Sequence, residues 1–502
     1  MNIDFFKKTA MRLKALFRVT ISVLALICLM PTAAYAGGAY EDIRGETLQK
    51  YMRDIVHFSM LSRHDGDLLW GRQAGTRYEK MTADYLLNHF KACGMDKVWQ
   101  EEIPLIEPQW TAARAELTLL GGSSPAAPLA DYQFGTAMAS VDARTQTPEE
   151  GIEAEIIDIG YGFRSGLEGV DLANKIVLVH RDAAWSTYLS YFKDIEATSF
   201  VEQGKALGAV FTVHMNIPTN MQVALWNGPR ARNIAHVNIG SGDGKYLREI
   251  IQASGPKHPP RVRLTVRGKI ETDLKTQNTF GLIRGRNSNE YVVLIAHTDA
   301  WFEGAVDNAS GLSVLLGLAR YFSQLPREQI RRNMLFIGTA AHHNGPASGT
   351  RNLVRSHRDI LDKTVILLNL EHFASVAPVK DGNVEGAYNE TVHILFDTHN
   401  HPFIQETIYA AAAQHSTPVH SNVLSYYIAD MGSFRSMGVP CVSLLQQTFW
   451  YHTVRDTMDR ITAKGLESAA RTHAQLLDAI NSAATEEIRK GWNPPRRRVL
   501  RD

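Results

Sequence analysis

The spacing of hydrophobic and polar residues along the chain changes several times, and each change predicts a different element. The stretch 79–94 (EKMTADYLLNHFKACG) has apolar residues three or four positions apart and ends on Gly94. This spacing predicts an amphipathic helix, and glycine commonly ends one. We therefore expect helical structure from about residue 40 to Cys93.

From about residue 275 onward the pattern is a strict alternation of strands and helices. Apolar runs of strand length alternate with amphipathic stretches such as SGLSVLLGLARYFSQL and HPFIQETIYAAAAQH. This order predicts an α/β fold, with a mainly parallel twisted sheet and helices on both faces. Ligands bind such sheets beyond the carboxyl ends of the strands. The five runs are EYVVLIAHTDA, NMLFIGTAAHH, KTVILLNLEH, VHILFDTHN and PCVSLLQQ.

Between about residues 130 and 270 the pattern indicates a separate small α/β module. NKIVLVHRD reads as a buried strand, and NIAHVNIGSGDGKYLREII reads as strand, turn and helix. Segments rich in Pro, Gly and Ser border this region on both sides. We expect residues 37–130 and 271–492 to form one domain, residues 131–270 to be inserted in it, and residues 493–502 to form a basic tail.

The N-terminus has the pattern of a signal peptide. Five basic residues precede the apolar run VTISVLALICLM, and Ala34-Tyr35-Ala36 supplies a cleavage site. The run is shorter than the roughly 20 residues of a membrane-spanning helix. We therefore expect residues 1–36 to be removed and the protein to be periplasmic or extracellular, with no stable membrane span after processing.

Composition narrows the classes of function. With 44% hydrophobic and 21% charged residues the chain is globular, and loss of residues 1–36 changes its net charge from +1 to −3. No long basic stripe remains, which argues against a nucleic-acid partner. Cys93 and Cys441 alone remain, too few for a cysteine-based zinc site, although one bridge between them is left open. The sequence defines no oligomeric state.

Residues that bind metals lie at the ends of several of the expected strands. A single histidine or acid at such a place is more often structural, but four such ends in one α/β domain predict a shared site. Histidine with Asp or Glu and without cysteine is typical of catalytic zinc. The residues are His297 with Asp299 and Asp307, His342 with His343, Glu371 with His372, and His452 with Asp456.

These motifs resemble those of a known family, the zinc-dependent exopeptidases that include secreted di-zinc aminopeptidases and the plasma and glutamate carboxypeptidases. The similar segments are HTDAWFEGAVDNASGLSVLLGLAR, LFIGTAAHHNG, LLNLEH, ADMGSFRSMGVPCVSLL and YHTVRDT. WGRQAGTRYEKMTADYL and EEIPL resemble the family's N-terminal segment. The resemblance implies a zinc-exopeptidase fold of the phosphorylase/hydrolase-like type. It also implies that residues 131–270 are an inserted protease-associated domain.

The resemblance also implies a set of ligands for one or two Zn²⁺ ions. His297 and Glu371 would bind the first metal, Asp307 would bridge the two, and His452 would bind the second. Asp299 would accept a hydrogen bond from His297 and orient its ring.

At one strand end the sequence departs from the family, which has two consecutive glutamates there. The first is the general base and the second is a metal ligand, whereas this chain has His342 and His343. The resemblance therefore makes His342 the proton acceptor and His343 a ligand. The reference pKa of imidazole, near 6.5, suits general-base work. Two carboxylates remain where the family has three, which weakens binding of a second ion. Three imidazoles favour zinc, with other transition metals open.

The resemblance implies a metal-dependent hydrolase that cleaves a peptide or small amide substrate. Two alternatives remain open within the same fold: a non-hydrolytic reaction, as in glutaminyl cyclase, or a binding protein without activity, as in transferrin receptor. Aromatic residues near the metal motifs could form a substrate pocket or belong to the core. These are Tyr426, Tyr427, Phe449 and Trp450.

Overall fold

The computed structural model describes most of the chain after the expected signal peptide. The described residues are 40–163, 166–182, 206–214, 220–227, 231–343, 348–378, 388–446 and 448–494. The expected signal peptide and most of the expected basic tail lie outside these residues. Within the described ranges, no helix combines the length and the apolar character needed to cross a membrane.

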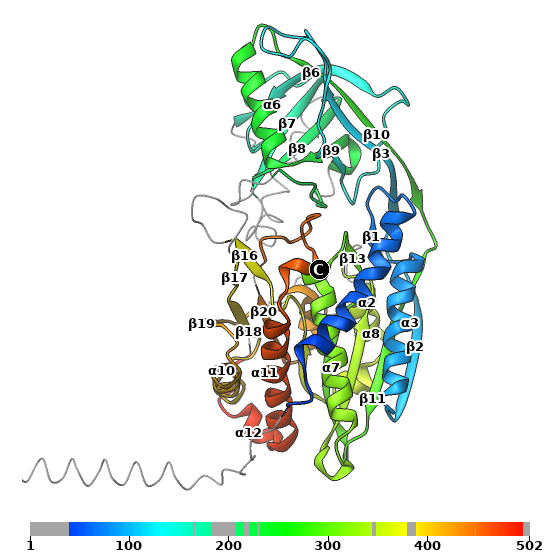
Figure 1. Cartoon of the computed structure of the whole chain (residues 1–502), viewed down its shortest axis with the longest axis vertical. Coiled ribbons are helices and arrows are strands. Elements are labelled where there is room, and N and C mark those ends of the chain that lie inside the picture. Colours follow the sequence, from blue (N-terminus) through cyan, green and yellow to red (C-terminus); the bar gives the residue numbers. More distant parts are fainter. Residues whose placement is uncertain are drawn as a thin grey trace, which may run out of the picture. The chain divides into compact units, whose positions relative to one another are not determined.

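One eight-stranded mixed sheet is built from the segments expected to form it. Its central strands β14, β12, β15 and β20 are parallel, whereas β11 and β2 at one side and β18 beside β20 run antiparallel to their neighbours. The sheet is therefore parallel in its centre only. Figure 1 labels β2, β11, β18 and β20. In spatial order the strands are β19 Val419–Leu424, β18 His393–Asp397, β20 Cys441–Gln446, β15 Thr364–Asn369, β12 Asn287–His297, β14 Arg332–Thr339, β11 Lys275–Ile283 and β2 Lys97–Pro104.

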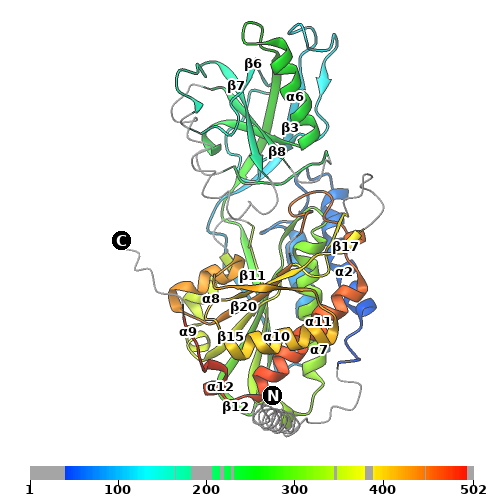
Figure 2. The ribbon, with the colours of Figure 1, turned by 90° about the vertical axis from the view of Figure 1, so that its left-hand side faces the viewer.

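Helices cover both faces of this sheet because its central strands carry apolar side chains on both sides. Helices α8 (Ser348–Ser356) and α9 (Arg358–Leu361) share a core with Val293 and Ile295 of β12. Figure 2 shows the strands running between these two helices and those of the other face. The other helices of the domain are α2 Gly45–His64, α3 Arg77–Ala92, α7 Gly311–Ser323, α10 Pro402–His415, α11 Ala463–Ser482 and α12 Thr485–Arg489.

A second eight-stranded sheet has its own core, and its ladders contain no strand of the first sheet. It packs against α6 (Ser241–Ser254). Its first long strand, β3, starts at Gln109 and pairs with β10, so the expected border at residue 130 lies about twenty residues too late. In spatial order the strands are β4 Tyr132–Gln133, β3 Gln109–Leu119, β10 Arg261–Glu271, β6 Ile152–Asp158, β7 Lys175–Asp182, β8 Gly208–His214, β9 Ala235–Ile239 and β5 Met138–Ala139.

Short elements complete the described structure. β1 (Gly71–Arg72) pairs with β13 (Ala300–Trp301), and β16 (Val376–Pro378) pairs with β17 (Tyr388–Glu390). Cys93 and Cys441 are both free, so the bridge left open by the sequence is absent. The short helical segments are η2 Ala231–Asn233, η3 Ala305–Ser310, η4 Arg327–Gln329, η5 Ala429–Met437 and η6 Met458–Arg460.

Strand register brings three chain segments to one edge of the first sheet. His297, the last residue of β12, is paired with Thr339, the last residue of β14. Ile295 of β12 is paired with Asn369, the last residue of β15. Because these strands are parallel, the residues that follow them emerge side by side at their carboxyl ends.

Two histidines in the core predict that the protein loses stability in acid. His393 and His473 flank Phe373, and burial lowers the pKa of each to about 4. The unfolded chain, with an ordinary histidine pKa near 6.5, therefore binds more protons below that pH. Stability is fully present above pH 6.5 and falls as the pH drops toward 4. We expect each histidine to cost on the order of 2 kcal/mol between pH 6.5 and 5.

Urea unfolding at pH 7 and pH 5 measures this cost. Between the two pH values, His473→Leu should lose less free energy of unfolding than the wild type. The difference should equal roughly the contribution of one histidine. The exposed His420→Gln is the matched control and should retain the wild-type slope. An unchanged slope in His473→Leu would show that this ring is not the source of the acid sensitivity.

Candidate metal centre

The carboxylate of Asp307 lies at the centre of a cluster of imidazoles. Its Oδ1 is 3.1 Å from Nε2 of His297 and 3.3 Å from Nε2 of His372. Its Oδ2 is 3.0 Å from Nε2 of His343 and 3.2 Å from Nε2 of His452. All five side chains are buried. One carboxylate thus faces two pairs of ring nitrogens, one pair on each oxygen.

Two groups of donor atoms share this carboxylate. His297, Asp307 and Glu371 bring one donor atom each within 4.8 Å of one another, and so do Asp307, His343 and His452. The five residues expected from the sequence to bind metal are therefore brought together in two overlapping sets. A carboxylate shared between two sets of donors is the arrangement that a pair of ions requires.

Several of these atoms lack hydrogen-bond partners despite complete burial. They include Nε2 of His297, His372 and His452, together with Oδ1 of Asp307 and Oε1 of Glu371. A buried polar atom without a partner costs free energy unless something else binds it. Two donors bound to one tetrahedral Zn²⁺ lie about 3.3 Å apart, close to the separations seen here. The donor set therefore fits zinc.

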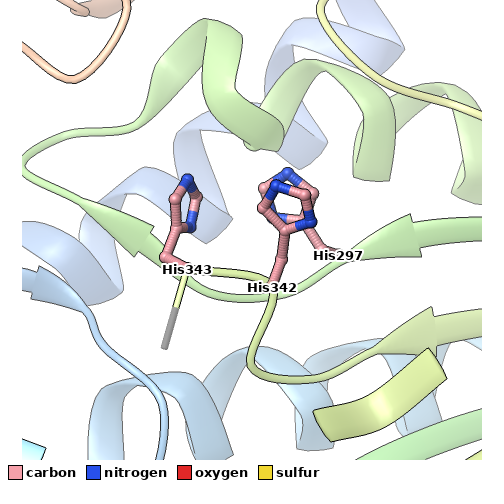
Figure 3. Close-up of side chains that lie close together, drawn as sticks. All are labelled: His297, His342 and His343. Atoms are coloured by element: carbon pink, nitrogen blue, oxygen red, sulfur yellow. The ribbon is translucent and has the colours of Figure 1, made fainter. Parts of the chain in front are cut away.

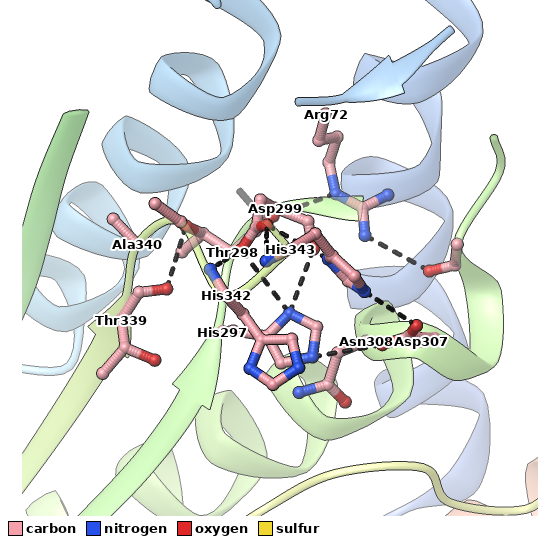
Figure 4. A network of polar contacts seen from close by, with 12 residues as sticks. Arg72, His297, Thr298, Asp299, Asp307, Asn308, Thr339, Ala340, His342 and His343 are labelled. Carbon is pink, nitrogen blue, oxygen red and sulfur yellow. Dashed lines mark hydrogen bonds and ion pairs between the residues drawn. The ribbon is translucent and has the colours of Figure 1, made fainter. Parts of the chain in front are cut away.

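Two further carboxylates hold the loops that carry the cluster. Asp299 accepts hydrogen bonds from the backbone N–H groups of His342, at 2.8 Å, and His343, at 2.7 Å (Figure 4). Asp456 accepts from the backbone N–H groups of Val306, at 2.7 Å, and Asp307, at 3.1 Å. Burial raises the pKa of Asp456 to about 7. Both carboxylates bind backbone N–H groups, so they fix the positions of His342, His343 and Asp307.

The role expected for Asp299 changes in the structure. Its carboxylate is 3.7 Å from Nδ1 of His297, beyond hydrogen-bond distance, and that ring nitrogen donates instead to the backbone carbonyl of Asp299, at 3.0 Å. The carboxylate accepts from Nδ1 of His343, at 3.1 Å. The expectation that it orients His297 is therefore wrong: the backbone turn after β12 places a carbonyl there, and the side chain orients His343.

His342 lies at the rim of the cluster beside the ligands. Its ring stacks on that of His297, with centroids 4.3 Å apart and planes 14° apart (Figure 3). Its Nδ1 is 2.8 Å from Oδ1 of Asp430, a buried residue of η5. Burial lowers the pKa of His342, but the Asp430 carboxylate outweighs it and raises that pKa to about 10. The Asp430 carboxylate therefore accepts a hydrogen bond from the Nδ1–H group of His342.

Left-handed backbone at three positions turns neighbouring side chains toward the site. Ala341, His372 and His452 have φ of 56°, 57° and 58°. Non-glycine residues adopt this conformation rarely, and it is often found at functional sites. The turn at His372 explains why consecutive residues Glu371 and His372 both reach the cluster rather than diverging.

Buried ionic groups behind the cluster fix the loop between His297 and Asp307. Arg72 is fully buried and donates to the carbonyls of Thr298, at 3.2 Å, and Glu303, at 2.9 Å. Glu79 of α3 accepts from the hydroxyl of Thr298 and from the N–H of Ala341. Burial raises the pKa of Glu79 to about 8. Arg72 and Glu79, both from the N-terminal part of the chain, thus hold the loops that carry the donor residues in place.

Sequence reasoning missed three residues of the site. His372 was noted beside Glu371 but was not assigned as a donor. Asp430 lies within the motif ADMGSFRSMGVPCVSLL, yet nothing in the pattern pairs it with His342. Arg72 lies in a polar glycine-bearing stretch, and no sequence signal marks it as buried.

The fold resembles that of known zinc aminopeptidases, and part of the chain matches a peptidase family. Residues 278–477 match the model of Peptidase family M28. Aminopeptidase YwaD of Bacillus subtilis (strain 168) is 23% identical over 439 residues, which are 84% of this chain and 82% of that protein. Human transferrin receptor protein 2 is 28% identical over 240 residues, 43% of this chain, and the match spans only 29% of the receptor.

A solved structure agrees with these matches at the level of the fold. BSAP, a zinc aminopeptidase from Bacillus subtilis, superposes with a TM-score of 0.60 and 19% identity. The match covers 89% of this chain and 98% of that one. The chain therefore has the fold of the M28 zinc aminopeptidases.

The arrangement predicts that Asp307 governs zinc binding as a whole. We expect Asp307→Ala to remove both groups of donors at once, whereas His452→Ala should weaken one group and spare the other. Isothermal titration with zinc measures the stoichiometry, and exposed His420→Gln is the control. Wild-type stoichiometry in Asp307→Ala would rule out this carboxylate as the shared ligand.

Proposed function

We propose that this protein is a zinc-dependent hydrolase of amide bonds, acting as an aminopeptidase. The observation that carries the proposal is the carboxylate of Asp307, placed between two pairs of buried imidazoles. Held there, zinc would supply Lewis-acid activation of water and of the amide carbonyl. We propose His297, Asp307, His343, Glu371 and His452 as its ligands, with His372 as an additional donor.

In this proposal His342 takes the proton of the attacking water. Burial alone would raise the pKa of Asp430, but His342 holds it below its ordinary value, so the carboxylate is ionised and accepts from Nδ1. Asp430 raises the pKa of His342 to about 10, so the ring is protonated until a cation binds beside it. Zinc bound at the donors would lower that pKa, and the neutral ring would then carry its lone pair on Nε2. Stacking on His297 keeps the ring beside the donor cluster. A His–Asp pair thereby replaces the glutamate that the family resemblance places at this position.

Aminopeptidase activity is proposed ahead of carboxypeptidase activity because of the relatives. YwaD is named an aminopeptidase, and BSAP is a zinc aminopeptidase.

Two further proposals concern the rest of the chain. Residues 1–36 act as a signal peptide, which places the enzyme in the periplasm or outside the cell. The strands from β3 to β10 form an inserted module of the protease-associated kind, a proposal supported by their separate sheet and core.

Substitution of His342 tests the proposed base. His342→Ala should lower turnover of an amino-acid 4-nitroanilide by a factor on the order of 10²–10⁴, the usual size of a general-base contribution, with zinc content retained. His342→Glu should preserve or raise turnover, because it restores the residue typical of the family. Asp430→Asn should cause a smaller loss than His342→Ala, because it misorients the ring without removing it.

Zinc content and the urea midpoint of each variant are measured alongside turnover, and His420→Gln is the surface control. Full activity in His342→Ala would place the base elsewhere. No turnover by the wild type on any amide, together with turnover gained in His342→Glu/His343→Glu, would show that the native site is not a hydrolase. The binding-protein alternative would then be favoured.

A further inference from the structure

A segment connected to the second sheet reaches the metal centre. Residues 220–227 follow β8 of that sheet, and the N–H of Ala224 donates to the carbonyl of His452, at 2.8 Å. The N–H of Val454 donates back to the carbonyl of Gln222, at 3.2 Å, and Val223 forms a β-bridge with Thr453. The loop that carries the ligand His452 is thus paired, strand to strand, with this segment.

The pairing places Trp226 against the ligand histidines. Its ring centroid is 5.5 Å from that of His452 and 6.2 Å from that of His343, with a near-parallel angle of 20° to the latter. It also contacts Trp301 edge to face, with centroids 4.6 Å apart. Trp301 is only 3% exposed, whereas Trp226 is half-buried. Trp226 therefore keeps part of its surface exposed while its ring contacts the rings of His343 and His452.

The backbone around Trp226 is held from several directions. Its carbonyl accepts from Nη1 of Arg181 in β7, at 2.9 Å. The carbonyl of the preceding Leu225 accepts from the N–H of Val141, at 3.2 Å, and from the hydroxyl of Ser140, at 2.8 Å. Because these groups fix the chain, the indole is presented in a defined place rather than on a free loop.

The surroundings of Trp226 are apolar. It packs on a buried cluster of Leu69, Trp70, Met138, Ala224, Trp301 and Phe302. The half-buried Tyr451 stacks on His452 and contacts His372, with the ring centroids of Tyr451 and His372 5.4 Å apart. The donors thus contact several aromatic rings, and among the described residues Trp226 and Tyr451 are partly exposed.

We propose that Trp226 is a specificity-determining residue, against which the apolar side chain of the substrate residue next to the cleaved amide packs. The inference rests on the proposed function and names its substrate class: peptides or amides that begin with a large apolar or aromatic residue. Contact with an indole buries apolar surface and stabilises such a side chain, but offers little to glycine. A carboxylate side chain would gain nothing from the ring's electron-rich face.

The kinetic test compares Trp226→Ala and Trp226→Phe on one set of 4-nitroanilides carrying leucine, phenylalanine, lysine, glycine or aspartate. Trp226→Ala should lower kcat/KM for leucine and phenylalanine at least tenfold, mainly through KM, and change the glycine value less than about twofold. Trp226→Phe should keep most of the preference. The same loss on every substrate, no loss, or a loss greatest for lysine would overturn the proposal.

A second measurement does not depend on turnover. Co²⁺ bound at the donors should quench the fluorescence of tryptophans beside them, and Trp226→Phe should remove a clear share of that quenching. The control is Trp492→Phe, because Trp492 contacts His399 and none of the metal donors. In this variant the quenching by Co²⁺ should be as large as in the wild type. Unchanged quenching in Trp226→Phe would overturn the placement of this ring.

The two failures can be told apart. If the wild type cleaves amides but Trp226→Ala keeps the wild-type preference, the inference fails and the proposed function stands. If the wild type cleaves no substrate of the set while Co²⁺ still binds and quenches, both the proposed function and the specificity inference are rejected.

Discussion

The contact between Asp307 and the surrounding imidazoles is the interaction on which the rest of the site depends. Four ring nitrogens approach one buried carboxylate within 3.3 Å, and several of these atoms have no hydrogen-bond partner. Such crowding of buried donors is unfavourable unless a cation holds them. The surrounding structure maintains it through Asp299, Asp456 and Arg72, which act mainly on backbone groups. Residues that are not themselves donors therefore fix the backbone that carries the donor side chains.

His342 and His343 lie where the family resemblance places two glutamates, and each has a carboxylate partner. His343 still approaches Asp307, and its other ring nitrogen is fixed by Asp299. His342 gains its own carboxylate, Asp430. The family resemblance places a negatively charged glutamate at position 342. Here the negative charge lies instead on Asp430, the hydrogen-bond partner of His342. In the proposed function, this arrangement would keep a proton acceptor beside the donors and would reduce the negative charge that faces zinc.

The sequence predicted the strands and helices of the first sheet well, because its apolar runs and helical spacing are strong local signals. It also predicted which residues meet, since parallel strands bring their ends to one edge. The antiparallel edge strands and the start of β3 in the second sheet were missed, because pairing across long separations leaves no local pattern. His372 was missed for a similar reason: its left-handed backbone is a tertiary constraint. The contact of Trp226 with His343 and His452 connects parts of the chain that belong to two sheets, and no local motif predicts it.

In the proposed zinc centre, which lies at the ends of parallel strands, Asp307 is the shared ligand. A crystal of the zinc-loaded protein, with data collected on both sides of the zinc absorption edge, tests it most directly. We expect anomalous peaks beside the Asp307 carboxylate, from zinc coordinated by residues of the two donor groups at about 2.0–2.2 Å. A zinc-loaded crystal without an anomalous peak at Asp307, or with zinc bound only at surface histidines, would contradict it.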